Sequence, residues 1–387
     1  MSPDDIVIHE AQTVATSSVK TGAEFVKFRD GGVLVSYNRD LKDVGYFSAN
    51  GGETWREVAW PGDSRCHTGL SDGTVLALSY AKDIEAVGDG LFHYKSWRIA
   101  PGCERMEGPF ITPVRIPEAT WGTGDNLSRF NGMLFWNTIL EMPDGRLLAT
   151  MYGYFKGDDV PFRSPQLTAY IEGLKQSGKT ADVPIASNDT IEGFNKYRTV
   201  VVESRDGGAS WDYLATVAYD PEIGQEGPCE PSMVLLPDGD LLCVMRTGYT
   251  HDRMCLCRSS DGGRTWTEPA LTHAFGVDPT LIVMRDGTLA CAYGVKGRDG
   301  GRRERRLMLS FDGGETWPVD LVVYAGTGGT YPSVCELGPG ELLYAYDAIG
   351  FADPLVEGRP RAYLRIARVQ LPGKAVQKPV TPLPVDI

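Results

Sequence analysis

The feature that most constrains the fold is an eight-residue motif that recurs along the chain, Ser-x-Asp-x-Gly-x-Thr-Trp. It reads SSDGGRTW from residue 259 and SFDGGETW from residue 310, with looser copies SRDGGASW from 204 and SANGGETW from 48. The starting points are separated by 156, 55 and 51 residues, and 156 is three times 52. A repeat of this length indicates one supersecondary unit copied along the chain.

A second repeated feature is a tight turn between two apolar, β-rich runs, which occurs six times. The turns are centred on Asp30, Asp72, Asp144, Asp238, Asp286 and Gly340. Asp-Gly between such runs is a strong hairpin signal because glycine tolerates the positive φ that these turns need. Each hairpin with the segment after it makes one four-stranded blade, although two blades lack the box. The sequence therefore predicts an all-β, six-bladed β-propeller.

The same spacing predicts a single domain over residues 1–387. Only one clear strand, 363–369, follows the last hairpin, so residues 6–10 are expected to supply the missing strand and close the ring. Insertions are expected near 100–130 and 155–197, on the face where the innermost strands begin, and a Pro-rich tail at 371–387. Within the second insertion, Ser164-Pro165 and the apolar spacing up to Gly178 predict a short helix.

Charge and cysteine content narrow the class of function. The net charge of -13 would repel a phosphate backbone and argues against a nucleic-acid partner. The eight cysteines form no CxxC pair and are interpreted as reduced thiols, and neither a metal site nor a cofactor is expected. The N-terminus lacks the features of a signal peptide and no long apolar run occurs, so a cytoplasmic protein with no membrane partner is expected. A homo-oligomer stays possible.

The residues that open the inner strands are expected to converge on the central axis. They are Lys20, His67, Asn137, Glu230, Asp278 and Tyr331. Glu230-Pro-Ser, Asp278-Pro-Thr and Tyr331-Pro-Ser stand at equivalent positions in three successive blades. Carboxylates, a tyrosine and an arginine at one end of a propeller channel indicate an acid/base site. His67 is open to a second interpretation, as an ordinary buried histidine.

The boxes on a six-blade count resemble those of the sialidase superfamily of glycoside hydrolases, over essentially the whole chain. That resemblance implies an arginine triad that grips the substrate carboxylate, a tyrosine nucleophile assisted by a glutamate, and an aspartate as acid/base. CEPSMVLLPDGDLLCVMRTG is similar to the family segment that holds the glutamate and one arginine, which implies these roles for Glu230 and Arg246. TYPSVCEL is similar to the family segment of the nucleophile, which implies that role for Tyr331.

The remaining positions come from the same resemblance. GGRRERRLMLS implies a triad arginine at Arg302, with Arg303, Arg305 and Arg306 as alternatives. Lys20 lies where the family has an Arg-Ile-Pro motif, and a lysine keeps the charge but loses the two-pronged grip of arginine. SYNRDLKDVGYFS implies a substrate-binding Arg39 and an acid/base at Asp43, or less favourably at Asp40.

The resemblance and the site together predict a function and leave alternatives. The expected activity is that of an exo-glycoside hydrolase that removes a terminal acidic sugar, with a carbohydrate as the partner. The catalytic residues would be Tyr331, Glu230 and Asp43, and the substrate-binding residues would be Arg246, Arg302, Lys20, Arg39, Asp278 and His67. One alternative is a propeller glycosidase of other specificity that uses only carboxylates, such as Glu230 with Asp278 or Asp43. The other is a carbohydrate-binding propeller without activity.

Overall fold

A computed structural model of the chain describes residues 1–17, 22–37, 44–61, 64–80, 84–88, 90–120, 133–163, 165–176, 190–248, 252–297, 303–350, 353 and 360–372. The regular structure in these ranges is almost entirely β, with α1 (Pro165–Gln176) as the α-helix. Among the described residues, no helix is both long and apolar enough to cross a membrane.

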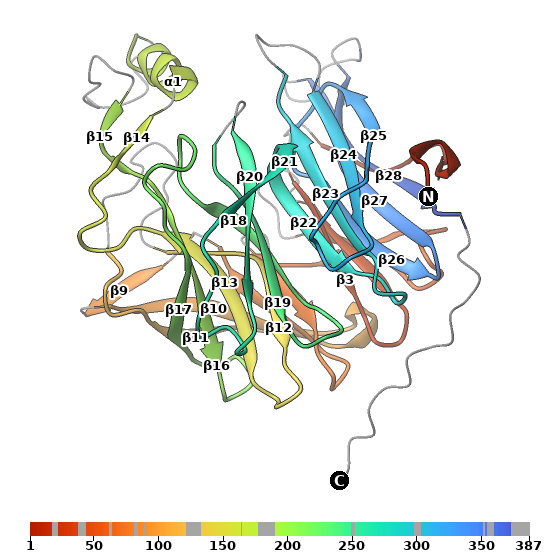
Figure 1. Cartoon of the computed structure of the whole chain (residues 1–387). Coiled ribbons are helices and arrows are strands. Elements are labelled where there is room, and N and C mark those ends of the chain that lie inside the picture. Colours follow the sequence, from red (N-terminus) through yellow and green to blue (C-terminus); the bar gives the residue numbers. More distant parts are fainter. Residues whose placement is uncertain are drawn as a thin grey trace.

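The strands form the six blades of a propeller, which confirms the predicted fold (Figure 1). Four blades follow the simple order of the chain. The first is β3 (Ala23–Lys27), β4 (Val33–Tyr37), β5 (Val44–Ser48) and β6 (Arg56–Ala59). The third is β12 (Leu134–Glu141), β13 (Leu147–Gly153), β16 (Arg198–Ser204) and β17 (Trp211–Ala218). The fourth is β18 (Cys229–Leu235), β19 (Leu241–Arg246), β20 (Arg253–Ser259) and β21 (Ala270–Phe275). The fifth is β22 (Val277–Val283), β23 (Leu289–Val295), β24 (Arg303–Ser310) and β25 (Val319–Gly326).

The other two blades contain additional strands. The second blade is built from β7 (Ser64–Gly69), β8 (Val75–Ser79), β10 (Leu91–Ile99), β9 (Glu85–Gly88) and β11 (Met106–Arg115). The sixth is built from β26 (Ser333–Gly338), β27 (Glu341–Gly350), β28 (Arg361–Gln370), β1 (Val7–Ile8) and β2 (Gln12–Ser17). Each inner strand contacts the next around a closed ring, in the order β3, β7, β12, β18, β22, β26 and back to β3.

All six predicted hairpins join an inner strand to the second strand of its blade. The fourth hairpin shows how Asp-Gly forms the tight turn. The Asp238 carboxylate accepts a hydrogen bond from the backbone N–H of Asp240, and Gly239 adopts a φ of 94°. Second strands such as β19 are buried along their whole length because neighbouring blades cover both of their faces. The core therefore lies between the blades, as in the cluster of Leu242, Val244, Leu281 and Leu289.

The repeated box is a structural device that closes the outer turn of a blade. In the copy at 259–266, the Ser259 hydroxyl accepts a hydrogen bond from the Gly263 N–H at 2.9 Å and donates one to Asp261 at 2.9 Å. The Asp261 carboxylate accepts from the Thr265 N–H, and the Trp266 indole N–H donates to the Gly263 carbonyl. The turn thereby satisfies its own backbone groups.

Replacing Ser259 by alanine is expected to lower the free energy of unfolding by about 1–2 kcal/mol, because the buried N–H of Gly263 loses its acceptor. Denaturant unfolding measures the change. Ser260→Ala, at the exposed neighbouring position, is the control and should change little. Equal effects of the two substitutions would contradict the structural role of the box.

The N-terminal segment closes the ring, as predicted. Val7 and Ile8 pair with Val369 and Gln370, which confirms the expected strand near residues 6–10. The segment also forms β2, whose residues 12–17 pair with residues 362–366 of β28. The closure is thus longer than the sequence predicts, because one strand of the last blade pairs with two successive N-terminal segments.

The two expected insertions have different outcomes. The predicted helix in 155–197 is confirmed as α1, which lies beside β14 (Pro161–Arg163) and β15 (Thr190–Asn195) at the top of Figure 1. The expected irregular segment from 100 is wrong in its first half. Met106–Arg115 instead forms β11, which pairs with β10 and runs parallel to β17. Residues 121–132, 177–189 and most of the tail, 373–387, lie outside the described residues.

Candidate active site

Irregularities in the inner strands bring the site residues together. Pairing between the inner and the second strand shifts register in the second to fifth blades, at positions that include Arg65, Asn137, Glu230 and Asp278. Three of these four residues have a positive φ, of 59° for Asn137, 47° for Glu230 and 50° for Asp278. Non-glycine residues adopt this conformation rarely, and bulges commonly re-aim side chains beside active sites. The bulges turn these side chains towards the axis.

Hydroxyl groups link the neighbouring inner strands just beyond these positions. The Ser232 hydroxyl accepts from the Leu281 N–H at 2.9 Å, and the Ser333 hydroxyl accepts from the Phe25 N–H at 3.1 Å. The Thr280 hydroxyl donates to the Pro332 carbonyl at 3.2 Å. In each x-Pro-Ser/Thr segment, the hydroxyl therefore holds the ring together while the first residue serves the site.

The hydrogen bonds of Leu281 and Phe25 also align the first blade with the fifth. Leu281 and Phe25 make equivalent hydrogen bonds to the neighbouring inner strand. Leu281 is the third residue after the site residue Asp278. The third residue before Phe25 is Gly22, which is therefore the equivalent of Asp278 in the first blade. The sequence predicts Lys20 near that position, and Lys20 lies outside the described residues. The inner strand of the first blade thus presents no side chain there, and Glu24 occupies the place of the linking hydroxyl.

The centre of the site is a hydrogen-bonded group around Glu230. The Tyr331 hydroxyl donates to Glu230 Oε1 at 2.9 Å, and Arg246 Nη1 donates to the same oxygen at 2.7 Å. Arg246 Nη1 also lies 3.4 Å from Tyr331 Oη, and its Nη2 is paired with Glu226. The side chains of Glu226, Glu230 and Arg246 are all buried. Tyr331, Glu230 and Arg246 are site residues predicted from the sequence, whereas Glu226 is not among the predicted residues.

Burial and charge set the protonation of this group. Burial by itself would raise the pKa of Glu230, but the Arg246 guanidinium and the hydrogen bonds to it lower that pKa below its usual value. Burial raises the pKa of Glu226, even against the charge of Arg246. Burial and the negative charge of Glu230 raise the pKa of Tyr331 well above its usual value. The resting state is thus a neutral phenol that donates to an ionised carboxylate.

Asp278 and Glu230 form a pair of neighbouring carboxyl groups whose pKa values shift in opposite directions. Its backbone N–H donates to Glu230 Oε2 at 3.1 Å. Burial, followed by the negative charge of Glu230, raises the pKa of the Asp278 carboxyl well above its usual value. Neighbouring carboxyl groups with pKa values pushed apart are typical of acid/base sites.

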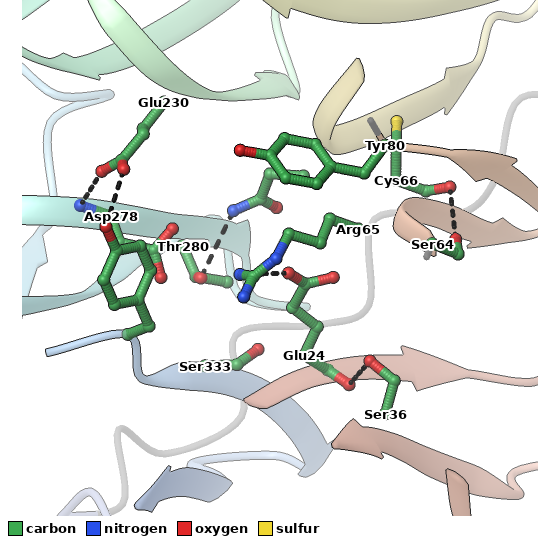
Figure 2. A network of polar contacts seen from close by, with 12 residues as sticks. Glu24, Ser36, Ser64, Arg65, Cys66, Tyr80, Glu230, Asp278, Thr280 and Ser333 are labelled. Atoms are coloured by element: carbon green, nitrogen blue, oxygen red, sulfur yellow. Dashed lines mark hydrogen bonds and ion pairs between the residues drawn. The ribbon is translucent and has the colours of Figure 1, made fainter. Parts of the chain in front are cut away.

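Arg65 lies on the first-blade side of Tyr331 and was missed by the sequence analysis. Its guanidinium carbon is 5.0 Å from the ring centroid of Trp136 and 5.6 Å from that of Tyr331, and its Nη1 is 3.4 Å from Glu24 Oε1. Figure 2 shows the Arg65 side chain reaching between Tyr80 and Glu24, with Glu230 and Asp278 across the view. A Cβ atom on Gly22 would lie 2.9 Å from Arg65 Nη1. Arg65 therefore fills the space that Gly22 leaves open.

Glu24 is a largely buried carboxyl group, with one oxygen bound by Arg65. Burial, opposed by the charge of Arg65, raises the pKa of Glu24 to about 7. Its Oε2 has no hydrogen-bond partner among the described residues, and His67 Nδ1 lies 3.8 Å from it. His67 packs edge-on against Trp60, and burial lowers the pKa of its imidazole to about 3. His67 is thus a neutral, buried neighbour of Glu24.

The structure brings together four of the predicted site residues: Tyr331, Glu230, Arg246 and Asp278. The predicted residues Lys20, Arg39, Asp43 and Arg302 lie outside the described ranges. Of the alternatives to Arg302, Arg303 donates to the Gly328 carbonyl, Arg305 is buried beside Asp347, and Arg306 pairs with Asp320.

The missed residues left faint signals in the sequence. Aligning Ala23-Glu24-Phe25 with Pro231-Ser232-Met233 would have placed Glu24 on an inner strand beside the site. Arg65 lies two residues before His67, on the same face of a regular strand, but the bulge between Ser64 and Cys66 is not visible in the sequence. Glu226 lies in the segment that connects to β18. That segment is not part of the repeated pattern, so no sequence signal marks Glu226 as a site residue.

Comparisons with known proteins agree with this fold. Residues 174–343 match the BNR repeat-like domain. A protein of unknown function from Dyadobacter fermentans has a TM-score of 0.64 at 19% identity, covering 95% of this chain and 100% of that one. A Hadza microbial sialidase has a TM-score of 0.55 at 14% identity, covering 92% of this chain and 68% of that one. A Penicillium chrysogenum α-L-arabinanase complexed with arabinobiose has a TM-score of 0.56 at 13% identity, covering 93% and 98%.

A comparison with curated proteins finds no match. The chain is therefore an all-β propeller of sialidase-like fold. Part of the chain is similar to the BNR repeat-like domain, and glycoside hydrolases share its architecture. At these identities the likeness establishes the fold, and the function has to be argued from the site.

Proposed function

We propose that this protein is a glycoside hydrolase that removes a terminal acidic sugar from a glycan, with Tyr331 as the nucleophile. The observation that carries the proposal is the hydrogen bond from the Tyr331 hydroxyl to Glu230, whose carboxylate is also bound by Arg246. The carbohydrate-active propellers of the same fold support a sugar as the partner.

The pair suits nucleophilic catalysis. As Tyr331 Oη attacks the anomeric carbon, its proton passes to Glu230 Oε1, to which it already donates. Arg246 keeps that carboxylate ionised and ready to accept the proton. A neutral phenol approaches an anomeric carbon beside an anionic substituent with less repulsion than a carboxylate does. The arrangement therefore favours an acidic sugar and predicts retention of the anomeric configuration.

The guanidinium group of Arg65 lies beside Tyr331 and can receive the acidic substituent, whereas the nitrogens of Arg246 are already bound to Glu226, Glu230 and Gly248. Burial raises the pKa of Glu24, the carboxyl neighbour of Arg65. Protonation of Glu24 leaves the positive charge of Arg65 for a ligand, inside a chain of net charge -13. A bidentate contact between a guanidinium and a carboxylate is the expected recognition.

A panel of umbelliferyl glycosides, which includes sialosides, uronides and arabinosides, tests the proposal. We expect hydrolysis of an acidic glycoside and a loss of kcat of roughly 10³-fold or more in Tyr331→Phe, because the attacking oxygen is gone. Tyr213→Phe, which removes only a hydrogen bond to Thr216, is the control and should retain activity. Inversion of configuration in the first product, seen by NMR, would contradict the proposal.

The pair Glu230 and Asp278 favours a second candidate, a glycosidase that uses only carboxylates. Arg246 lowers the pKa of Glu230 while burial raises the pKa of Asp278, and shifts in these directions suit a base or nucleophile and an acid respectively. In that case Tyr331→Phe should keep substantial turnover, while Asp278→Asn should lose it. The two variants, measured on the same substrate, separate the candidates.

A further inference from the structure

We propose that Glu24 is the acid/base residue of this site, the group that protonates the leaving oxygen and later deprotonates water. The inference rests on the proposed hydrolysis and adds a residue to it. A displacement by Tyr331 needs a second group that gives a proton to the departing glycosidic oxygen. The position, the free oxygen and the surroundings of Glu24 each support that role.

Glu24 lies next to the nucleophile but on the other side from Glu230. The Ala23 N–H donates to the Tyr331 carbonyl at 3.3 Å, and the Phe25 N–H donates to the Ser333 hydroxyl. Residues 23–25 are thereby fixed against the segment that carries Tyr331. Glu24 belongs to the first blade and Glu230 to the fourth, which stand opposite each other in the ring of six. The two carboxyl groups therefore flank Tyr331 from opposite sides.

The Glu24 carboxyl is held by one oxygen and free at the other. Arg65 Nη1 pairs with Oε1 at 3.4 Å and so orients the group. Oε2 is buried and has no hydrogen-bond partner among the described residues, although a buried polar atom normally has one. Oε2 lies 3.8 Å from His67 Nδ1, which likewise has no hydrogen-bond partner among the described residues, and part of the Glu24 side chain stays exposed. A turn of the carboxyl group towards that exposed side lets a bound glycoside supply the missing partner.

The groups around Glu24 permit it to carry a proton. Arg65 and His67 face it from β7, Asp278 faces it from β22, and Tyr331 precedes β26. His67 is neutral, so Arg65 is the cation that opposes the effect of burial. The resulting pKa of about 7 lets Glu24 alternate between acid and base near neutral pH.

The steps balance. In the first, Tyr331 Oη bonds to the anomeric carbon and releases its proton to Glu230, while the glycosidic bond breaks and its oxygen takes the proton of Glu24. In the second, Glu24 takes a proton from water, and the water oxygen bonds to the anomeric carbon. The bond to Tyr331 Oη then breaks, and Glu230 returns the proton to that oxygen. The enzyme ends as it began.

Glu24→Gln tests the role through its dependence on the leaving group. With an alkyl or sugar leaving group, which needs protonation, kcat/KM should fall about 10²–10⁴-fold. With a dinitrophenyl leaving group, which departs without protonation, the loss should be less than about 10-fold, and azide should accelerate turnover because it needs no base. Glu336→Gln is the matched control, because Glu336 is also a buried carboxyl with a raised pKa but is bound by Arg285 away from the site.

The pH dependence provides a second readout. In the wild type, kcat/KM for the poor leaving group should fall as pH rises through about 7, where Glu24 loses its proton, and the variant should lack that limb. Ionisation of a buried carboxyl destabilises the fold, so Glu24→Gln should unfold at a higher temperature than the wild type at pH 8 but not at pH 5. Equal losses of kcat/KM in Glu24→Gln with both leaving groups would overturn the assignment of Glu24. The activity of Tyr331→Phe tests the proposed function separately, so the two failures are distinguishable.

Discussion

Replacing Arg246 by methionine is expected to lower the free energy of unfolding by about 3–5 kcal/mol and to abolish activity. Arg246 is the shared partner of two buried carboxyl groups, Glu226 and Glu230. Without it, Glu230 would be a buried charge that has lost the cation hydrogen-bonded to it, with the charge of Lys296 as the cationic influence that remains. Guanidinium chloride unfolding and the glycoside panel measure the two effects.

The loss of stability in Arg246→Met should depend on pH. In the wild type the pKa of Glu230 is lowered, so its stabilising contribution is present above its ordinary pKa and is lost as pH falls. In the variant the largest effect that opposes burial is gone, and only weaker ones from Lys296 and Tyr331 remain. Burial should then raise the pKa of Glu230, so stability should decrease as pH rises. The difference between the two proteins should therefore grow from pH 4 to pH 8.

A double variant, Arg246→Met with Glu230→Gln, is the control for the charge argument. It removes the uncompensated carboxylate and should regain part of the lost stability, but not activity. Stability of the double variant equal to or below that of Arg246→Met at pH 8 would contradict the account of the site as a compensated charge cluster.

Deleting residues 1–17 is the second large effect, because this segment supplies β1 and β2 of the sixth blade. The deletion exposes the edge of β28, which pairs with both strands, and removes Ala15 from the core cluster between the first and sixth blades. At roughly 1 kcal/mol for each lost backbone hydrogen bond, a loss on the order of 5 kcal/mol is expected, with aggregation through the free edge. Calorimetry and size-exclusion chromatography measure the result.

Two further variants keep this prediction testable where the deletion gives no soluble protein. Ala15→Asp puts a carboxylate into the cluster formed by Ala15, Val33, Val35 and Leu364, and should lower the unfolding temperature by a smaller amount. Deleting only residues 1–5 removes no strand and should have little effect. If Ala15→Asp and the short deletion have equal effects, the closure does not depend on β2.

Much of the fold is visible in the sequence because it depends on local chemistry. The Asp-Gly turns and the boxes satisfy their own backbone groups within a few residues, as Asp238 and Ser259 do. The repeat of these units then predicts the number of blades. The expected insertion from residue 100 failed because β11 pairs with β10 and with a strand of the next blade, and such pairing leaves no periodic signal.

The site residues also fall into two groups, those that the sequence predicts and those that depend on the tertiary structure. Tyr331, Glu230, Asp278 and Arg246 belong to repeated segments and could be named from their sequence context. Glu24, Arg65 and Glu226 could not, because their roles depend on where a bulge turns a side chain and on which blades meet when the ring closes. A single-residue bulge at Arg65 decides which residue fills the space beside Gly22.

The sequence by itself determined a six-bladed propeller, the positions of its turns, and a tyrosine, two carboxyl groups and an arginine at one end of its inner strands. The tertiary structure decided which of these groups touch and which carry protons. Closing the ring brings residues 24, 65, 230 and 331 together from four blades, and burial then raises some pKa values while Arg246 lowers another. Turn chemistry acts between neighbours in the chain, whereas desolvation and charge act between neighbours in space.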